Sequence, residues 1–130
     1  MTQEDKDLLL KDLCTRLPYN VRVEYNGTTF SNIFDVLGIA HGRIMLCLPF
    51  MSKTECPLIG EVKPYLFPMS SMTEEQKNVH DTLVFNINFI ESGRKTVVRM
   101  LFEFYLKNHI DYNGLIEKGL ANDATGLNIY

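Results

Sequence analysis

The residues best suited to chemistry stand near the C-terminus, where His109 and Asp111 lie two positions apart in the segment NHIDYNGLIEKGLAND. A histidine beside a carboxylate can act as an acid–base couple. The same residues also fit two helix ends, because an imidazolium stabilises a helix C-terminus and an aspartate caps the helix that follows. We favour this second interpretation, in which Asp111 is a structural cap and has no catalytic role.

Metal ligands and nucleophiles are few and widely spaced. No pair of histidines or cysteines has the short spacing of a zinc motif among the candidates His41, Cys47, Cys56, His80 and His109. The chain also lacks a phosphate-binding loop, a dinucleotide fingerprint and a nucleophile elbow. We therefore expect no catalytic residue, no metal and no cofactor, and a small enzyme is our third choice of function.

Composition narrows the class of protein. The chain has 130 residues, 45% of them hydrophobic and 22% charged, which is typical of one globular domain. Its net charge of -3 argues against a broad surface for nucleic acid or an anionic membrane. Three cysteines do not suggest a disulfide framework, and neither a signal peptide nor a membrane span is evident. We expect a cytoplasmic protein without membrane attachment.

The first element that must position any site is an N-terminal helix within residues 1–18. Its apolar side is expected to carry Leu9, Leu10, Leu13, Cys14 and Leu17, which recur at helical spacing. Asp12 and Arg16 are four residues apart, and we place this pair on the solvent side, where it would add only tenths of a kcal/mol. Pro18 ends the helix.

Residues 20–63 favour an antiparallel meander of about four strands. Polar and apolar residues alternate after residue 20, and Asn26-Gly27 is a strong signal for a tight hairpin turn. GIAHG (38–42) marks a second turn, RIMLCLPF (43–50) a central strand and LIGEV (58–62) a short edge strand. The predicted class is therefore α+β, with a sheet that could curl into a small open barrel.

Residues 64–121 are expected to form an extended segment followed by helices. Tyr65, Leu66 and Phe67 lie in a stretch with two prolines, which we expect to cross the body with these side chains exposed. Ser71 and Glu74 fit a capping box for a helix from about residue 72 to about residue 81. LVFNINFI (83–90) fits both a strand and a helix, and its asparagines favour the strand slightly.

The next helix, from residue 96 to about residue 109, is apolar on nearly all sides. Its charged residues Arg99, Glu103 and Lys107 form one narrow stripe. Such a helix is either central in the fold, which we favour, or carries surface for a partner. A short helix from about residue 112 to 121 should follow the Asp111 cap, and the tail 122–130 should fray.

Three blocks resemble a family of small uncharacterised proteins of gut bacteria and their phages. They are LLLKDLCTRLPYNV (8–21), EVKPYLFPMSSMTEEQK (61–77) and FEFYLKNHIDYNGLIEKGLA (102–121), the last resembling the ending F-D-W-L-N-x-H-H-F-D-Y-R-G-L-I-E-K-G-L-A. Phe104, Asn108 and Asn113 depart from that pattern, and residues 78–100 do not resemble the family's middle. The family has no established activity, so the resemblance implies an accessory cytoplasmic protein of a mobile element and no site.

The sequence therefore predicts a non-enzymatic protein-binding or regulatory accessory protein, with a protein partner or self-association. The candidate interaction surface comprises Tyr65, Leu66, Phe67, Arg94, Lys95 and Arg99. The alternative is a nucleic-acid-associated factor that uses the cations 94, 95 and 99, with Lys77 nearby. The partner, the oligomeric state and the biological process remain open at this stage.

Overall fold

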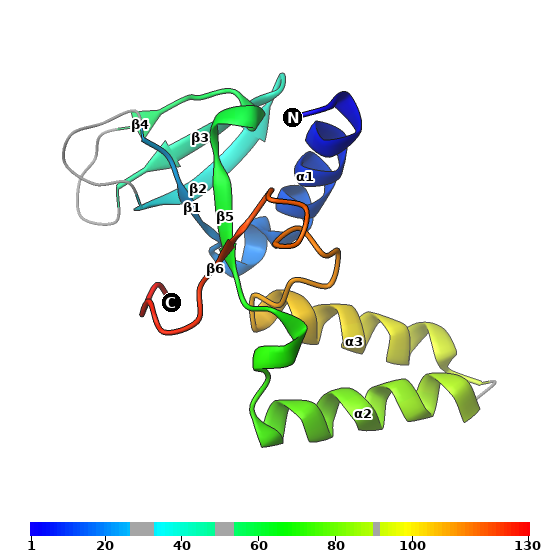
Figure 1. Ribbon diagram of the computed structural model, residues 1–130. Helices are drawn as coiled ribbons and strands as arrows, with labels where there is room; N and C mark the ends of the chain where they lie inside the picture. The colour runs from blue at the N-terminus through cyan, green and yellow to red at the C-terminus, as the bar shows by residue number, and fades with distance from the viewer. Residues whose placement is uncertain (27–32, 49–53, 90–91) are drawn as a thin grey trace.

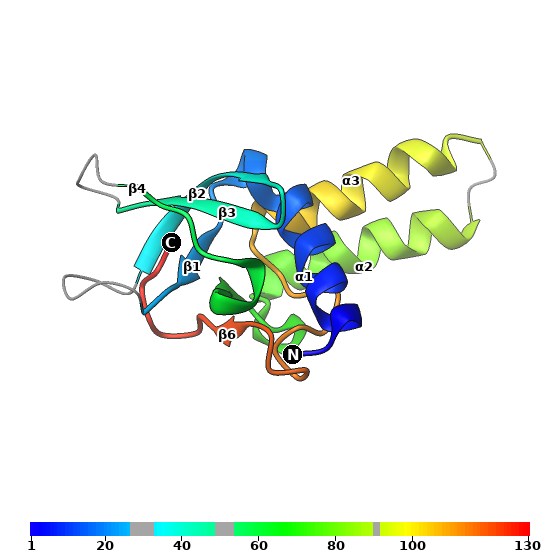
Figure 2. The same cartoon turned by 90° about the horizontal axis from the view of Figure 1, so that it is seen from above.

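A computed structural model describes residues 1–26, 33–48, 54–89 and 92–130. The chain forms a body, made of an open sheet, one helix and the C-terminal segment, and a helical hairpin that projects from it (Figure 1). Seen from above, the hairpin extends away from the sheet (Figure 2). The predicted α+β class is confirmed.

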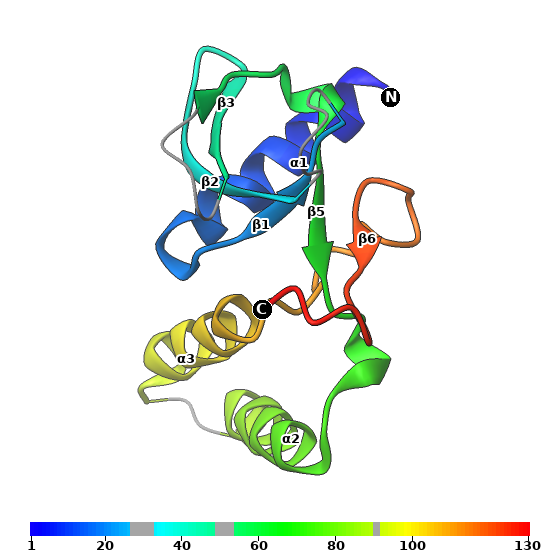
Figure 3. The same cartoon turned by 90° about the vertical axis from the view of Figure 1, so that its left-hand side faces the viewer.

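The N-terminal helix α1 (Gln3–Arg16) begins at a capping box in which Thr2 and Asp5 exchange hydrogen bonds. It continues into a 3-10 turn, η1 (Leu17–Tyr19). Leu9 and Leu13 are fully buried against the sheet, which curves around α1 (Figure 3). The helix is where the sequence predicts it.

The orientation of α1 differs from the prediction at three positions. Asp12 and Arg16 are buried, and Cys14 is exposed. The pair was expected on the solvent side because ion pairs four residues apart usually face water. Here Arg16 reaches a buried carbonyl of the C-terminal segment, so the helix side that bears the pair turns inward.

The sheet has the strand order β4-β3-β2-β1-β5-β6. The strands are β1 (Arg22–Glu24), β2 (Ile33–Ala40), β3 (Arg43–Cys47), β4 (Thr54–Glu55), β5 (Lys63–Leu66) and β6 (Asn122–Asp123). All neighbours are antiparallel except β5 and β6, which are parallel. Within the described residues the two edge strands, β4 and β6, do not pair with each other, so the sheet stays open and does not close into a barrel.

A tight turn joins β2 to β3 at His41-Gly42. Both residues have positive φ, 54° and 73°, and the flanking Ala40 and Arg43 are paired. Positive φ at both central positions is what a two-residue hairpin of type I′ requires. The turn predicted in GIAHG is therefore confirmed, whereas the one predicted at Asn26-Gly27 involves a residue outside the described part of the chain.

The segment around residues 58–67 differs from the prediction. LIGEV is not a strand, because Ile59–Glu61 form a 3-10 turn, η2. The following segment is a strand, β5, which lies between β1 and β6 inside the sheet. Tyr65 and Leu66 are consequently buried, and Phe67 is half-buried, so the expectation that these three side chains are exposed is wrong.

The C-terminal segment is packed against the body. Residues 112–121 form successive turns in place of the predicted helix, and Gly114 and Gly119 have positive φ that an α-helix does not allow. The tail does not fray: β6 lies in it, and Ala124 and Ile129 are buried. Leu115 and Leu120 of this segment belong to the hydrophobic core. The other buried apolar residues of the core include Val21, Val23, Phe34, Ile44, Leu46 and Val62.

The hairpin consists of α2 (Glu74–Phe89) and α3 (Arg94–Lys107), preceded by a 3-10 turn, η3 (Met69–Ser71). Residues 83–89 belong to α2, so the preference for a strand there is wrong, because Leu83 is buried by the packing of α2 on α3. Residue 90 lies outside the described residues. The predicted α3 helix is confirmed.

The cap of α2 differs from the prediction. Thr73 Oγ1 accepts a hydrogen bond from the Gln76 backbone at 3.2 Å, and the Gln76 side chain accepts one from the Thr73 backbone at 3.0 Å. Ser71 donates to the Pro68 carbonyl, and Glu74 is already within the helix. The T-x-x-Q box lies two residues after the predicted S-x-x-E box, so the correct cap is Thr73 with Gln76.

Helix α3 is not the central helix of the fold. Among its residues only Tyr105 and Leu106, close to its C-terminal end, are buried. The remainder lies along α2 in the projecting hairpin (Figure 1). Within the described residues, no helix combines the length and apolar character needed to cross a membrane.

Candidate interaction surface

A buried ion pair joins α1 to the base of the hairpin. Arg16 donates from Nε to Asp12 Oδ2 at 2.6 Å and from Nη2 to the Ile110 carbonyl at 2.8 Å. Asn113 donates to the other oxygen of Asp12 at 2.9 Å, and the Arg16 guanidinium lies 5.2 Å from the centre of the Tyr112 ring. These charge-assisted bonds hold the segment that follows α3 against α1.

An aromatic chain continues from this ion pair into the hairpin. The Tyr112 ring stacks on Tyr105 of α3, with centroids 5.4 Å apart. The Tyr105 hydroxyl in turn lies 2.8 Å from His80 Nε2 of α2, and burial raises the pKa of Tyr105. Phe102 meets both tyrosines edge-on. The base of the hairpin is thereby fixed to the body.

His109 has a structural role different from the one predicted. Its φ of 54° ends the helical path, and its ring stacks on Tyr130 with centroids 3.6 Å apart. Burial, with Arg16 and Arg22 as further causes, lowers the pKa of His109 to about 4. The imidazole is therefore neutral at pH 7 and does not stabilise the helix dipole as a cation. Its Nδ1 is buried and has no hydrogen-bond partner among the described residues.

Asp111 is a cap, as predicted, but of a turn. Its two carboxylate oxygens accept hydrogen bonds from the backbone of Leu115 at 2.8 Å and of Ile116 at 2.9 Å. No hydrogen bond joins its carboxylate to His109 among the described contacts. His109 thus ends the helical path before Ile110, and Asp111 caps the turn after it. The two residues do not form an acid–base couple.

Tyr130 fixes the end of the chain to the sheet. Its hydroxyl donates to the Tyr65 carbonyl at 2.7 Å and accepts from the Arg22 backbone at 3.0 Å. Burial is the main cause that raises the pKa of Tyr130 to about 12. The Arg22 side chain also bonds the Ile129 carbonyl and pairs with Asp35 at 2.9 Å. This side of the body is therefore occupied by its own C-terminus.

The hairpin exposes large apolar side chains. Phe85 and Phe89 are 59% and 72% exposed, and their rings stack with centroids 4.4 Å apart. His80 contacts α3, and at about 100° per residue Phe85 and Phe89 lie about 140° and 180° around α2 from it. The aromatic pair therefore faces away from α3, on the outer side of α2.

A second apolar area lies beside the seam between the two helices. Val79 and Met100 are about half exposed there, and they line a groove together with Tyr19, Leu83, Glu103, Phe104 and Lys107. The groove begins at the body, where Tyr19 ends η1, and follows α2 and α3. With Phe85 and Phe89, Val79 and Met100 give the hairpin several exposed large apolar side chains, although others, such as Leu58 and Leu127, are exposed on the body.

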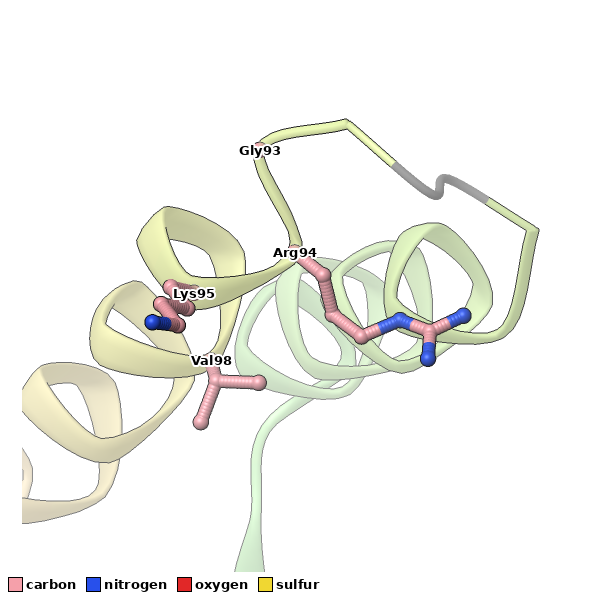
Figure 4. Close-up of a pocket in the computed structure, with 4 residues that line it drawn as sticks. All are labelled: Gly93, Arg94, Lys95 and Val98. Carbon is pink, nitrogen blue, oxygen red and sulfur yellow. The ribbon is translucent and has the colours of Figure 1, made fainter.

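The predicted cations lie at the free end of the hairpin, which we call the tip. Arg94, Lys95 and Arg99 are exposed on the first turns of α3. Arg94, Lys95, Gly93 and Val98 line a hollow, and Arg94 extends toward α2 while Lys95 points the other way (Figure 4). Lys77 is near the opposite end, since the neighbouring Gln76 bonds Asn108 just after α3. It does not join the cluster.

The six residues of the predicted interaction surface thus lie in two separate regions. Tyr65, Leu66 and Phe67 belong to the body, whereas the three cations belong to the tip. Phe85 and Phe89 were missed because a strand was preferred there. The signal was present: residues 82–90 carry no charge, and two phenylalanines four apart share one side of a helix.

Within the described residues, no group of three or more histidine, cysteine, aspartate or glutamate side chains could hold a metal ion. Comparisons with protein-family models, with curated proteins and with solved structures give no significant match for this chain.

Proposed function

We propose that the protein is a non-enzymatic binding module whose α2–α3 hairpin docks onto another protein surface. The observation that supports this function is the outward-facing aromatic pair Phe85 and Phe89. Burying two such side chains at an interface removes a large apolar area from water, worth about 1.5–3 kcal/mol for each fully buried side chain. Aromatic side chains of this kind are typical anchors of protein interfaces.

The construction of the hairpin supports the same proposal. Its base is fixed by the Tyr112–Tyr105–His80 chain, so the exposed face is held in place on a preformed element. A preformed face loses little conformational entropy on binding. The body supplies the rigid attachment, and the hairpin supplies the contact surface.

The setting is part of the proposal. An accessory or regulatory role in the cytoplasm, in a phage or another mobile element, fits a small domain with a docking hairpin and the family resemblance of the three sequence blocks. Such a protein acts by occupying a partner's surface, which requires no catalytic group.

The test is a comparison of captured proteins. The immobilised chain should retain one or more proteins from its native cytoplasm, and the Phe85→Ser/Phe89→Ser variant should retain at least about tenfold less, equivalent to a loss of about 1.4 kcal/mol. Leu58→Ser/Leu127→Ser is the matched control, because these two side chains are similarly exposed but belong to the body. Equal retention by both variants would contradict the proposal.

Nucleic-acid binding is the second candidate function, and it is favoured by the exposed cations Arg94, Lys95 and Arg99 at one end of α3. Phosphate contacts by three cations would give an affinity that falls steeply with salt. Electrophoretic mobility with mixed DNA and RNA pools at low salt tests this function. A shift abolished by Arg94→Glu/Lys95→Glu/Arg99→Glu would support it, and no shift with the wild-type chain would eliminate it.

A further inference from the structure

A pocket of about 480 Å³ lies where the hairpin joins the body, and we call it the base pocket. Four parts of the chain form it: the connection from β5 to α2, the first turn of α2, the end of α3 and the end of the tail. The lining residues are Phe67, Ser71, Met72, Thr73, Gln76, Lys107, Asn108, His109, Ile110 and Tyr130. Small-molecule sites usually measure roughly 300–1,000 Å³, so the base pocket has the size of such a site.

Two side-chain amides connect the helices at the base pocket. Gln76 Nε2 of α2 donates to Asn108 Oδ1 at 3.2 Å, and Asn108 Nδ2 donates to the Phe104 carbonyl at 2.8 Å. An amide nitrogen carries two hydrogens, so each side chain keeps one N–H without a partner among the described contacts. The Thr73 hydroxyl accepts from the Gln76 backbone and keeps its own hydrogen for a further bond. The pocket therefore offers several hydrogen-bond donors in one place.

Lys107 is the cation of the base pocket. It is exposed in the last turn of α3, and the contacts of the described residues include no ion pair for it. No aspartate or glutamate is among the lining residues. Donors together with one cation suit a ligand group that only accepts hydrogen bonds and carries a negative charge. A carboxylate matches the single cation, whereas a phosphate group would carry a charge of about -1.5 to -2.

Another wall of the base pocket is aromatic. The end of the chain lies beside the end of α3, where the Tyr130 ring stacks on His109 with centroids 3.6 Å apart (Figure 3). The Phe67 ring lies 6.1 Å from that of Tyr130. The Tyr130 hydroxyl is bonded within the body, yet the residue is 41% exposed. A flat ring in the pocket can therefore pack against this wall, since aromatic rings favour offset or edge-on contacts.

We propose that the base pocket binds a small aromatic carboxylate, whose ring lies against the aromatic wall and whose carboxylate accepts from Lys107 and the two amides. The site goes beyond the proposed docking function, because neither Phe85 nor Phe89 lines it. The ligand contacts both the hairpin and the body. A ligand that binds only the folded chain also raises the free energy of unfolding by mass action.

A two-dimensional NMR titration of the full chain with 2-naphthoate is the first measurement. We expect saturable binding with a dissociation constant on the order of 0.1–1 mM, which is usual for a ligand of this size. The side-chain amide signals of Gln76 and Asn108 should shift, because these groups bond the carboxylate. No saturable binding up to about 10 mM, or shifts confined to other parts of the chain, overturns the proposal.

The neutral analogue 2-naphthamide tests the charge of the ligand. It has nearly the same shape as 2-naphthoate but cannot form the charge-assisted contact with Lys107, so it should bind at least about threefold more weakly. Equal dissociation constants for the acid and the amide would contradict the preference for a carboxylate.

Substitutions at Lys107 locate the carboxylate. Lys107→Gln should raise the dissociation constant of 2-naphthoate about threefold to tenfold, and Lys107→Arg should restore most of the affinity because it keeps the cation. Lys11→Gln is the matched control, since Lys11 is an exposed lysine of α1 that does not line the pocket, and it should leave the affinity unchanged. Equal effects of Lys107→Gln and Lys11→Gln would show that only net charge matters, and would overturn the site.

Asn108→Asp tests the donor role of the amide. The variant replaces an N–H donor by a carboxylate of the same size, so the dissociation constant of 2-naphthoate should rise at least about tenfold. Circular dichroism checks folding, since an acidic residue at the end of α3 opposes the helix dipole. If helix content falls, Asn108→Ser takes its place and should raise the dissociation constant about twofold to threefold. Unchanged affinity in the folded variant contradicts the assigned donor.

Discussion

The body and the hairpin place the same residue types in opposite surroundings. Phe34 of the body is fully buried, whereas Phe89 of the hairpin is 72% exposed. The Asp12–Arg16 pair of the body is fully buried and bonded, whereas Arg94, Lys95 and Arg99 of the hairpin are exposed. In these two comparisons the body buries the side chains among their neighbours, whereas the hairpin leaves them exposed.

The difference indicates a division of roles. Removing a buried side chain from the body should cost folding stability, because its neighbours have no other partner. Removing an exposed side chain from the hairpin should cost association and leave folding nearly unchanged. Four measurements of stability test how sharp this division is.

The largest effect is expected at Arg16. Arg16→Met would leave the Asp12 carboxylate buried without its cation and remove the bond to the Ile110 carbonyl. Breaking a buried pair from one side costs about 3–5 kcal/mol, so urea unfolding should show a loss of that size. Asp7→Ala, which removes an exposed carboxylate from the same helix, is the control and should cost under about 0.5 kcal/mol.

The second prediction compares a phenylalanine-to-alanine substitution in the body with one in the hairpin. Phe34→Ala should lower the free energy of unfolding by about 3–5 kcal/mol, because it leaves a cavity in the core. Phe89→Ala should change it by under about 0.5 kcal/mol. Urea unfolding of the two variants at a concentration where the chain is monomeric measures the difference. Equal losses would show that the hairpin folds as part of the same core.

The first part of the chain shows what its sequence could predict. A helix within residues 1–18 was predicted from the spacing of its apolar residues and from Pro18, and the structure has it at Gln3–Arg16. The sheet was predicted from the alternation of polar and apolar residues. The burial of Asp12 and Arg16 was not predictable, because the four-residue spacing of the pair is the same whether that side of the helix faces solvent or the core. Its position depends on the Ile110 carbonyl, 94 residues from Arg16 in sequence.

Predicting the candidate interaction surface also required a contact between separate elements. Residues 83–89 fit two periods, and the packing of α2 on α3 decided between them. The preference for a strand hid the aromatic pair Phe85 and Phe89. The tip cations were predicted as part of a candidate interaction surface, and the structure shows that they are exposed. Asp111 was correctly identified as a cap, but the positive φ of Gly114 and Gly119 makes the capped element a turn.

The third effect is a pH dependence that comes from the body. His109 has a pKa of about 4 in the folded chain and an ordinary value of 6.5, so the unfolded chain binds more protons between these two values. Stability that is present above pH 6.5 is therefore lost as the pH falls toward 4. Between pH 7 and pH 5 the contribution of this one group should fall by about 1–2 kcal/mol, because solvent screens the partly exposed ring, and urea unfolding measures this loss.

His109→Asn is the matched control for this titration. Asparagine tolerates the positive φ at this position but does not titrate. The variant should keep the fold and lose about 1–2 kcal/mol less than the wild-type chain over the same pH interval. Identical slopes for the two chains would assign the pH dependence to carboxylates and contradict the neutral state of His109.

The smallest effect concerns the start of the hairpin and distinguishes the observed cap from the predicted one. Thr73→Ala removes the side chain that accepts from the Gln76 backbone and should cost about 1 kcal/mol, whereas Glu74→Ala should cost only a few tenths. Thermal unfolding followed by circular dichroism measures both. If the hairpin unfolds separately from the body, the loss from Thr73→Ala should appear only in the transition of the hairpin, because the cap holds nothing but the first turn of α2. A larger loss from Glu74→Ala than from Thr73→Ala would restore the cap predicted from the sequence.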